Sequence, residues 1–128
     1  MVNRLRILCQ GRWYGALDPA LAGAVDLVVS NPPYVGAGEL ASLDPVLAHE
    51  PRAALVAPDL DGVAGFADVA AVIDGAPAWL APGGALVVEH GAAQGEAAVA
   101  RAAAAGLAGV ADVADLAGWP RVLVARAR

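Results

Sequence analysis

The sequence predicts an α/β fold whose sheet is mostly parallel and ends in an antiparallel hairpin. Two near-continuous apolar runs, Val25–Ser30 and residues 85–89, are typical of strands that are covered on both faces. Between them, residues 61–80 carry apolar side chains at helical spacing, and a strand–helix–strand order favours a parallel pair. Residues 117–120 form a link so short that the last two strands are expected to be antiparallel.

The remaining elements follow from the same patterns. They are a strand at residues 4–9, a loop at 10–23, a turn at 81–84, a helix at 92–105, and strands at 109–116 and 121–125. Gly106 is expected to end the second helix. Residues 32–58 are polar and rich in proline, and a loop of that length in a compact domain is usually functional or mobile.

Length and composition limit the classes of function. The chain has 128 residues, which fits one small domain. No stretch approaches about 18 apolar residues without a charge or a Pro/Gly break, so no membrane span is predicted. The first residues lack the long apolar segment of a signal peptide, and we therefore expect a cytoplasmic protein. The net charge of −5 argues against a large nucleic-acid-binding surface, and the absence of a Cys/His cluster predicts no metal site.

The most informative motif is Asn31-Pro32-Pro33-Tyr34, the NPPY tetrapeptide, which directly follows the predicted strand Val25–Ser30. Asn31 offers a side-chain carbonyl oxygen and Pro32 a backbone carbonyl as hydrogen-bond acceptors, and neither proline has an N–H that would compete. Two acceptors that converge on one planar NH2 group would hold its nitrogen in place, while an aromatic ring lies against its plane. The motif indicates methylation of a planar nitrogen with S-adenosylmethionine.

Several of these residues also have a purely structural interpretation. The tetrapeptide is compatible with a simple strand-ending turn. Glu89 ends the second predicted strand, where it would lie near a ligand or cap the following helix. His90 is expected to pack locally, Gln94 to serve the helix start, and Glu50 to be either solvated or at the site.

With this topology beside the NPPY tetrapeptide, the chain resembles the class I methyltransferases. More narrowly, it resembles the HemK/PrmC family, which methylates the glutamine side-chain amide of peptide chain release factors. NPPY alone also occurs in adenine-amine methyltransferases of DNA and RNA, whereas EPRAAL at residues 50–55 and EHGAAQGE at residues 89–96 are more specific. The matching segments are residues 25–35, 50–55, 61–63, 80–96 and 115–126.

The resemblance implies a Rossmann-like class I methyltransferase sheet and S-adenosyl-L-methionine as the cofactor. It implies that Asn31, Pro32 and Tyr34 are the catalytic residues, and that the whole NPPY tetrapeptide, Pro33 included, binds the substrate together with Glu50. Asn31 and, more weakly, Trp13 would contact the cofactor. The implied partner is a peptide chain release factor, without direct contact to nucleic acid or to a membrane.

The chain departs from the family pattern in the half that binds the cofactor. The glycine-rich acidic loop D/E-x-G-x-G-x-G is missing, and so is the acid that binds the ribose hydroxyls. Arg12 stands before Trp13, where the family often has an acidic or small residue. We therefore expect residues 1–128 to be the C-terminal part of a methyltransferase catalytic domain, without its first two strands and its N-terminal helical domain.

Such a truncation leaves the strand at residues 4–9 without its usual neighbour, so it would dock elsewhere, pair with another chain or fray. It also leaves three functions open. The first is glutamine methylation of release factors, with the activity of this chain unsettled. The second is adenine-amine methylation of DNA or RNA, which usually requires a basic target-recognition region. The third is a non-catalytic remnant, or half of a split enzyme.

Overall fold

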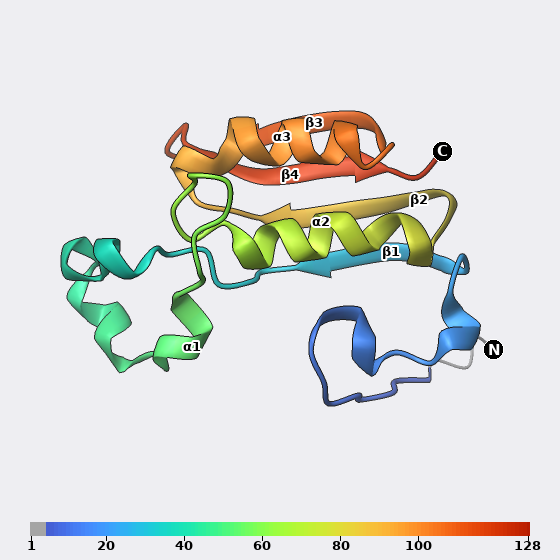
Figure 1. Cartoon of the computed structure of the whole chain (residues 1–128), viewed down its shortest axis with the longest axis horizontal. Helices are drawn as coiled ribbons and strands as arrows, with labels where there is room; N and C mark the ends of the chain where they lie inside the picture. Colours follow the sequence, from blue (N-terminus) through green and yellow to red (C-terminus); the bar gives the residue numbers. More distant parts are fainter. Residues whose placement is uncertain (1–4) are drawn as a thin grey trace.

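The computed structural model of the chain describes residues 5–128, and its centre is one four-stranded sheet (Figure 1). The strand order is β1-β2-β4-β3, with β1 at Val25–Ser30, β2 at Leu80–Glu89, β3 at Ala108–Ala114 and β4 at Pro120–Arg126. β1 and β2 are parallel, whereas β4 is antiparallel to both β2 and β3. Three of the four strands therefore run in one direction, which confirms the predicted mostly parallel sheet with its antiparallel C-terminal hairpin.

Two helices cover one face of this sheet (Figure 1). α2, Ala67–Trp79, packs against β1 and β2, and α3, Gly95–Ala104, packs against β3 and β4. The core between helices and sheet is centred on Ile73, Leu86 and Leu123, which are fully buried. Burying each of these side chains contributes about 1.5–3 kcal/mol to folding. Within residues 5–128, no helix has the length and hydropathy needed to cross a membrane.

The long segment between β1 and α2 forms a lobe beside the sheet (Figure 1). It contains two 3-10 helices, at Ala37–Ser42 and Pro45–His49, and the single-turn helix α1 at Arg52–Leu55. One pair of backbone bonds ties it together: Val35 N–H donates to the Leu55 carbonyl, and Ala57 N–H donates to the Val35 carbonyl. The segment predicted as a loop is thus folded into short turns rather than extended.

The predicted helix at residues 61–80 begins later than expected, at Ala67. Asp61, Gly62 and Gly65 all have positive φ angles (50°, 78° and 64°), and such a backbone cannot be helical. The predicted turn at residues 81–84 lies inside β2, as an irregularity where the pairing register with β1 shifts. Gly106, with φ 85°, follows α3 as predicted.

Two expectations about the N-terminal half are wrong. Residues 5–9 form no strand, and Leu5 and Leu8 are exposed (82% and 100%); Arg4, the first residue of that prediction, lies outside the described residues. β1 is also not covered on both faces, because Leu27 and Val29, which alternate along the strand with the core-packed Val28, are exposed. Within residues 5–128, β1 is an edge strand with a single neighbour, so residues 5–9 pair with no strand there.

Tyr14 anchors the N-terminal segment to α2. Its hydroxyl donates a 2.6 Å hydrogen bond to the carbonyl of Val72, and its ring stacks on Trp79 with centroids 6.0 Å apart. Burial raises the pKa of Tyr14 to about 12, so the folded chain favours the protonated hydroxyl.

Replacing Tyr14 with Phe removes this hydrogen bond and keeps the ring. We expect the free energy of unfolding to fall by about 1 kcal/mol at neutral pH. Because the folded pKa is raised from 10.0 to about 12, the hydroxyl contribution is complete below pH 10 and is lost as the pH rises toward 12. Urea titrations of both proteins at neutral pH and across this window measure the difference. A difference that grows with alkaline pH contradicts the assignment.

Gly65 lies where the lobe meets the start of α2, and a side chain there has no room. A Cβ at Gly65 would lie 2.5 Å from the carbonyl oxygen of Tyr34 and 2.6 Å from the backbone nitrogen of Gly36. Gly62 has the same left-handed backbone but open space around it, so it is a matched control. We expect Gly62→Ala to cost about 1 kcal/mol from backbone strain alone, and Gly65→Ala to cost clearly more. Urea denaturation of both variants measures this, and equal losses contradict the close approach.

Candidate functional site

Because β1 and β2 are parallel, the chain segments at their carboxyl ends lie at the same end of the sheet. Ser30 pairs with Val88 at the carboxyl ends of these strands, so the NPPY tetrapeptide after β1 lies beside Glu89, the last residue of β2, and His90, which follows it. Ligands of open α/β sheets bind beyond the carboxyl ends of the strands. The topology therefore places the two segments where the sequence predicted a site.

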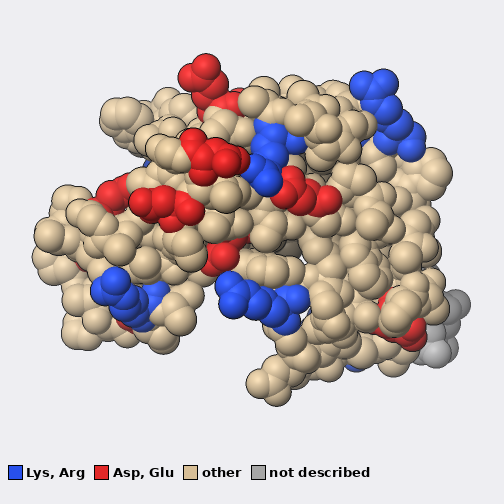
Figure 2. All heavy atoms as spheres, in the orientation of Figure 1, with Lys and Arg blue, Asp and Glu red and all other residues tan. Residues whose placement is uncertain are grey.

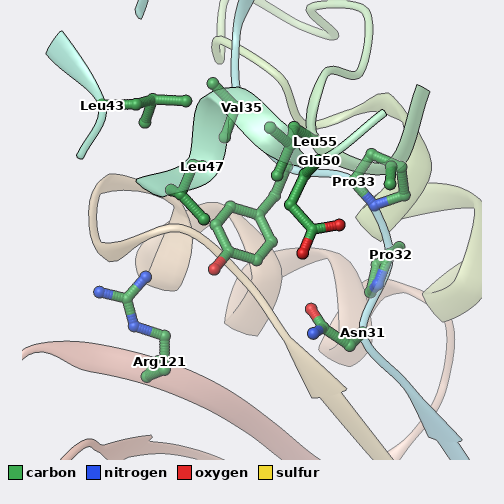
Figure 3. A pocket seen from close by; sticks show the side chains of 11 residues that line it. Asn31, Pro32, Pro33, Val35, Leu43, Leu47, Glu50, Leu55 and Arg121 are labelled. Carbon is green, nitrogen blue, oxygen red and sulfur yellow. The ribbon is translucent and has the colours of Figure 1, made fainter. Parts of the chain in front are cut away.

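A cavity of about 570 Å³, here called the Asn31 cavity, opens at this end of the sheet. Figure 3 shows the Asn31 side chain and the Glu50 carboxylate pointing toward the same space, with Arg121 on the opposite side. The structure thus brings the whole NPPY tetrapeptide together with Glu50, from separate parts of the lobe. The lining residues are Asn31, Pro32, Pro33, Tyr34, Val35, Leu43, Leu47, Glu50, Ala54, Leu55 and Arg121.

The two proposed acceptors at the cavity are available to a ligand. Asn31 is exposed, and no described residue forms a hydrogen bond with its side chain. The Pro32 carbonyl likewise receives no hydrogen bond from any donor within residues 5–128, although the proline ring itself is buried. A ligand with an NH2 group therefore would not have to displace an internal bond of the protein.

The side chain of Gln94 holds the backbone around the NPPY tetrapeptide in place. Its side-chain nitrogen donates to the carbonyls of Tyr34 (2.9 Å) and Ala64 (2.7 Å), and its side-chain oxygen accepts from the N–H of Gly91 (2.9 Å). Gln94 is buried, so each of these bonds is formed away from water. The residue expected to serve only the helix start thus also connects the loop after β1 to the loop after β2.

His90 supports the same junction. Its ring is completely buried, with Nδ1 2.8 Å from the Gly91 carbonyl and Nε2 2.9 Å from a carboxylate oxygen of Asp112 on β3. Both ring nitrogens are therefore engaged within the protein, and His90 does not line the Asn31 cavity. The expectation that His90 packs locally is confirmed.

Tyr34 connects the cavity to Glu89. Its hydroxyl donates a 2.8 Å hydrogen bond to a carboxylate oxygen of Glu89. Burial, followed by the hydrogen bond and the charge of Glu89, raises the pKa of Tyr34, while Arg121 acts in the opposite direction. The phenol consequently stays protonated at neutral pH, and its ring is held at the wall of the cavity. Glu89 therefore positions Tyr34, a role that its place in the sequence did not reveal.

Trp13 lies elsewhere. It lines a separate cavity of about 530 Å³, the Trp13 cavity, beside β1 and α2, and it does not border the Asn31 cavity. The remaining lining residues are Tyr14, Leu17, Leu21, Val25, Leu27, Val28, Val29, Ser30 and Val72. The Arg12 guanidinium lies 5.9 Å from the centre of the Trp13 ring.

These residues fit S-adenosyl-L-methionine only in part. An apolar and aromatic wall suits a flat adenine ring. However, no carboxylate lines the Trp13 cavity, so the ribose hydroxyls would lack the acidic partner that the family pattern requires. Arg12 beside Trp13 adds a cation where the family often has an acid or a small residue. The described residues therefore do not form a complete site for this cofactor.

The sequence analysis did not assign Arg121, Leu43 and Leu47 to the site. The two leucines come from the lobe and give the Asn31 cavity its apolar wall. Arg121 comes from β4, far along the chain, and reaches the cavity only because β4 pairs with β2. The segment at residues 115–126 matches the family pattern, but nothing in it marks this arginine as a cavity residue.

Comparison with curated proteins finds several release factor glutamine methyltransferases. Release factor glutamine methyltransferase of Salmonella typhimurium is 42% identical over 96 residues, which cover 75% of this chain and 32% of that protein. The enzyme of the same name from Bordetella pertussis is 46% identical over 95 residues, which cover 74% of this chain and 33% of that protein. The chain therefore spans about a third of the length of these relatives.

A further relative has a different name. It is the 4-amino-L-phenylalanine/4-methylamino-L-phenylalanine methyltransferase of Streptomyces pristinaespiralis, 46% identical over 76 residues, or 59% of this chain and 25% of that protein. No protein-family model matches the chain. Among solved structures, the antibiotic-resistance methyltransferase Kmr covers 88% of this chain and 55% of its own, with 21% identity and a TM-score of 0.45.

The relatives agree on methyl transfer, and those from Salmonella and Bordetella share one name. Over the part of those proteins that it matches, the chain is similar to the release factor glutamine methyltransferases, which supports the resemblance to the HemK/PrmC family.

Proposed function

We propose that this chain holds the side-chain amide of a glutamine residue of a peptide chain release factor, in the cytoplasm, for methylation that depends on S-adenosyl-L-methionine. The observation that carries the proposal is the pair of unused acceptors at the Asn31 cavity. The Asn31 side-chain oxygen and the Pro32 carbonyl are the groups that can accept the two hydrogens of a carboxamide NH2. The names of the relatives support glutamine as the residue that carries this group.

The chemistry asked of this site is mainly placement. Two hydrogen bonds from one NH2 group fix the orientation of its nitrogen. This fixed orientation is the main advantage that a bound amide has in the reaction over an amide free in water. No strong base is required, because a protonated N-methyl amide is so acidic that it loses its proton to water. Tyr34 and the apolar lobe residues would shape the pocket around the amide. Glu50, whose carboxylate points toward the space that Asn31 borders, would accept a further hydrogen bond from the substrate.

The described residues support this proposal for the methyl acceptor more than for the methyl donor. In the described part of the chain, the Trp13 cavity has no carboxylate that could bind the ribose of S-adenosyl-L-methionine, the methyl donor. We therefore assign residues 5–128 to acceptor binding.

A role on nucleic acid has less support. The chain carries a net charge of −5, and on the face shown in Figure 2 the described arginine side chains stand apart from one another without forming a continuous basic surface. Base-modifying enzymes must hold a flipped nucleotide and its phosphates, and they generally use clustered basic residues for this.

Asn31→Ala tests the acceptor site directly. We expect binding of a fluorescently labelled glutamine peptide to weaken about tenfold or more, because the amide loses one of its two acceptors. Gln10→Ala is the matched control, since Gln10 is an exposed carboxamide outside the cavity. Fluorescence anisotropy measures both variants without any cofactor. Equal affinities for wild type and Asn31→Ala contradict the proposal.

Calorimetry and a transfer assay separate the remaining functions. We expect no binding of S-adenosyl-L-methionine at micromolar concentration, because the chain offers the ribose no acid; micromolar binding shows that the described residues suffice. The transfer assay uses labelled cofactor with release factor, DNA, 4-amino-L-phenylalanine or no acceptor. Label on release factor supports glutamine methylation, and label on DNA or on the amino acid overturns it. Peptide binding without any label leaves this chain as the acceptor-binding part alone.

A further inference from the structure

A second cavity adjoins the Asn31 cavity. It has a volume of about 540 Å³, and we call it the Ala64 cavity. It shares Tyr34, Val35, Leu43 and Arg121 with the Asn31 cavity, so these four residues form the border between the two. Most of its remaining wall consists of small residues that project little into the space. The Asn31 cavity therefore continues past Tyr34 instead of ending there.

Arg121 lies at this border, and its guanidinium has N–H donors available for a ligand. Its Nε lies 3.4 Å from a carboxylate oxygen of Asp115, and its Nη1 lies 3.5 Å from the carbonyl of His90. Both distances are long for hydrogen bonds of a guanidinium, which has five N–H donors. Arg121 also interacts with the Tyr34 hydroxyl, and it opposes the rise in pKa that burial causes there. Within residues 5–128, Nη2 has no hydrogen-bond partner at standard geometry. The side chain is 27% exposed, so a ligand in either cavity can reach it.

We propose that Arg121 binds main-chain carbonyl groups of an extended acceptor polypeptide that occupies both cavities. The inference rests on the proposed function and adds how the flanking residues are recognised. The glutamine side chain enters the Asn31 cavity, and the neighbouring residue of the polypeptide lies in the Ala64 cavity. The guanidinium at the border then donates to the peptide backbone between them.

The surrounding charges favour a neutral carbonyl over an acidic side chain as the partner of Arg121. Glu50 lines the Asn31 cavity and Glu39 lines the Ala64 cavity. An aspartate or glutamate of the substrate would approach Arg121 between these two carboxylates and would be repelled by them. A backbone carbonyl accepts the same hydrogen bonds without a net charge.

Arg121→Gln tests this inference with three ligands. They are the blocked peptide Ala-Ala-Gln-Ala-Ala, the same peptide with norleucine in place of glutamine, and butyramide, which has a carboxamide but no peptide backbone. We expect Arg121→Gln to weaken binding of the glutamine peptide at least tenfold, because charged hydrogen bonds to the backbone are lost. Binding of butyramide, followed by the NMR signals of the Asn31 side chain, stays unchanged.

Arg126→Gln is the matched control. Arg126 lies at the other end of β4 and donates to the Gly83 carbonyl, and it lines neither cavity. Arg121→Gln leaves Asp115 its bonds from the backbone N–H groups of Ala117 and Trp119, so the hairpin is expected to stay folded. Near-UV circular dichroism checks the fold of both variants. In the wild type, the guanidinium NMR signal of Arg121 is expected to shift when peptide binds.

The outcomes separate this inference from the function on which it rests. If the norleucine peptide binds as well as the glutamine peptide but still requires Arg121, the proposed function fails and the role of Arg121 stands. If glutamine is preferred and Arg121→Gln has no effect, the proposed function stands and the inference is overturned. A wild-type chain that binds neither peptide overturns the inference as well. A peptide with aspartate beside glutamine that binds tenfold tighter shows that Arg121 recognises an acid, and it overturns the carbonyl assignment.

Discussion

One buried carboxamide, the side chain of Gln94, holds the two loops of the candidate site together. Its NH2 group donates to two carbonyls of the lobe, and its oxygen accepts a hydrogen bond from the N–H of Gly91. A buried carbonyl that loses its partner costs about 1–3 kcal/mol, so the three bonds favour a single arrangement of the lobe. His90, held between Gly91 and Asp112, supports Gly91 from the other side. The geometry of the NPPY tetrapeptide thus depends on residues that do not line the Asn31 cavity.

Residues 5–128 offer more groups that could bind the methyl acceptor than groups that could bind the methyl donor. On the acceptor side, Asn31, Pro32 and Glu50 meet in one cavity and leave their acceptors unused. On the donor side, Trp13 lies in a separate, mainly apolar cavity with a guanidinium nearby. The division follows from topology. The acceptor loops follow β1 and β2, which are paired with each other, whereas the opposite edge of β1 has no strand beside it within residues 5–128.

Within residues 5–128, missing neighbours, beside residues 5–9 and on one face of β1, explain where sequence patterns misled. Residues 5–9 and β1 both carry the apolar runs of buried strands, yet Leu8 and Val29 are exposed. An apolar pattern indicates that a segment is suited to burial. The segment is buried only where another element packs against it. Tyr14 shows the converse, because its packing against α2 holds a segment that has no regular pattern of its own.

From the sequence alone one obtains the strands from Val25 onward, the NPPY tetrapeptide at a strand end, and the family resemblance, because each is written in local patterns of a few residues. Glu50 could be named from its motif, but its meeting with Asn31 required the fold of the lobe. Arg121 and Gln94 acquired their roles only in space, since their partners lie 31 and 60 residues away. Contacts over such separations depend on the register of paired strands, and no local pattern encodes that register.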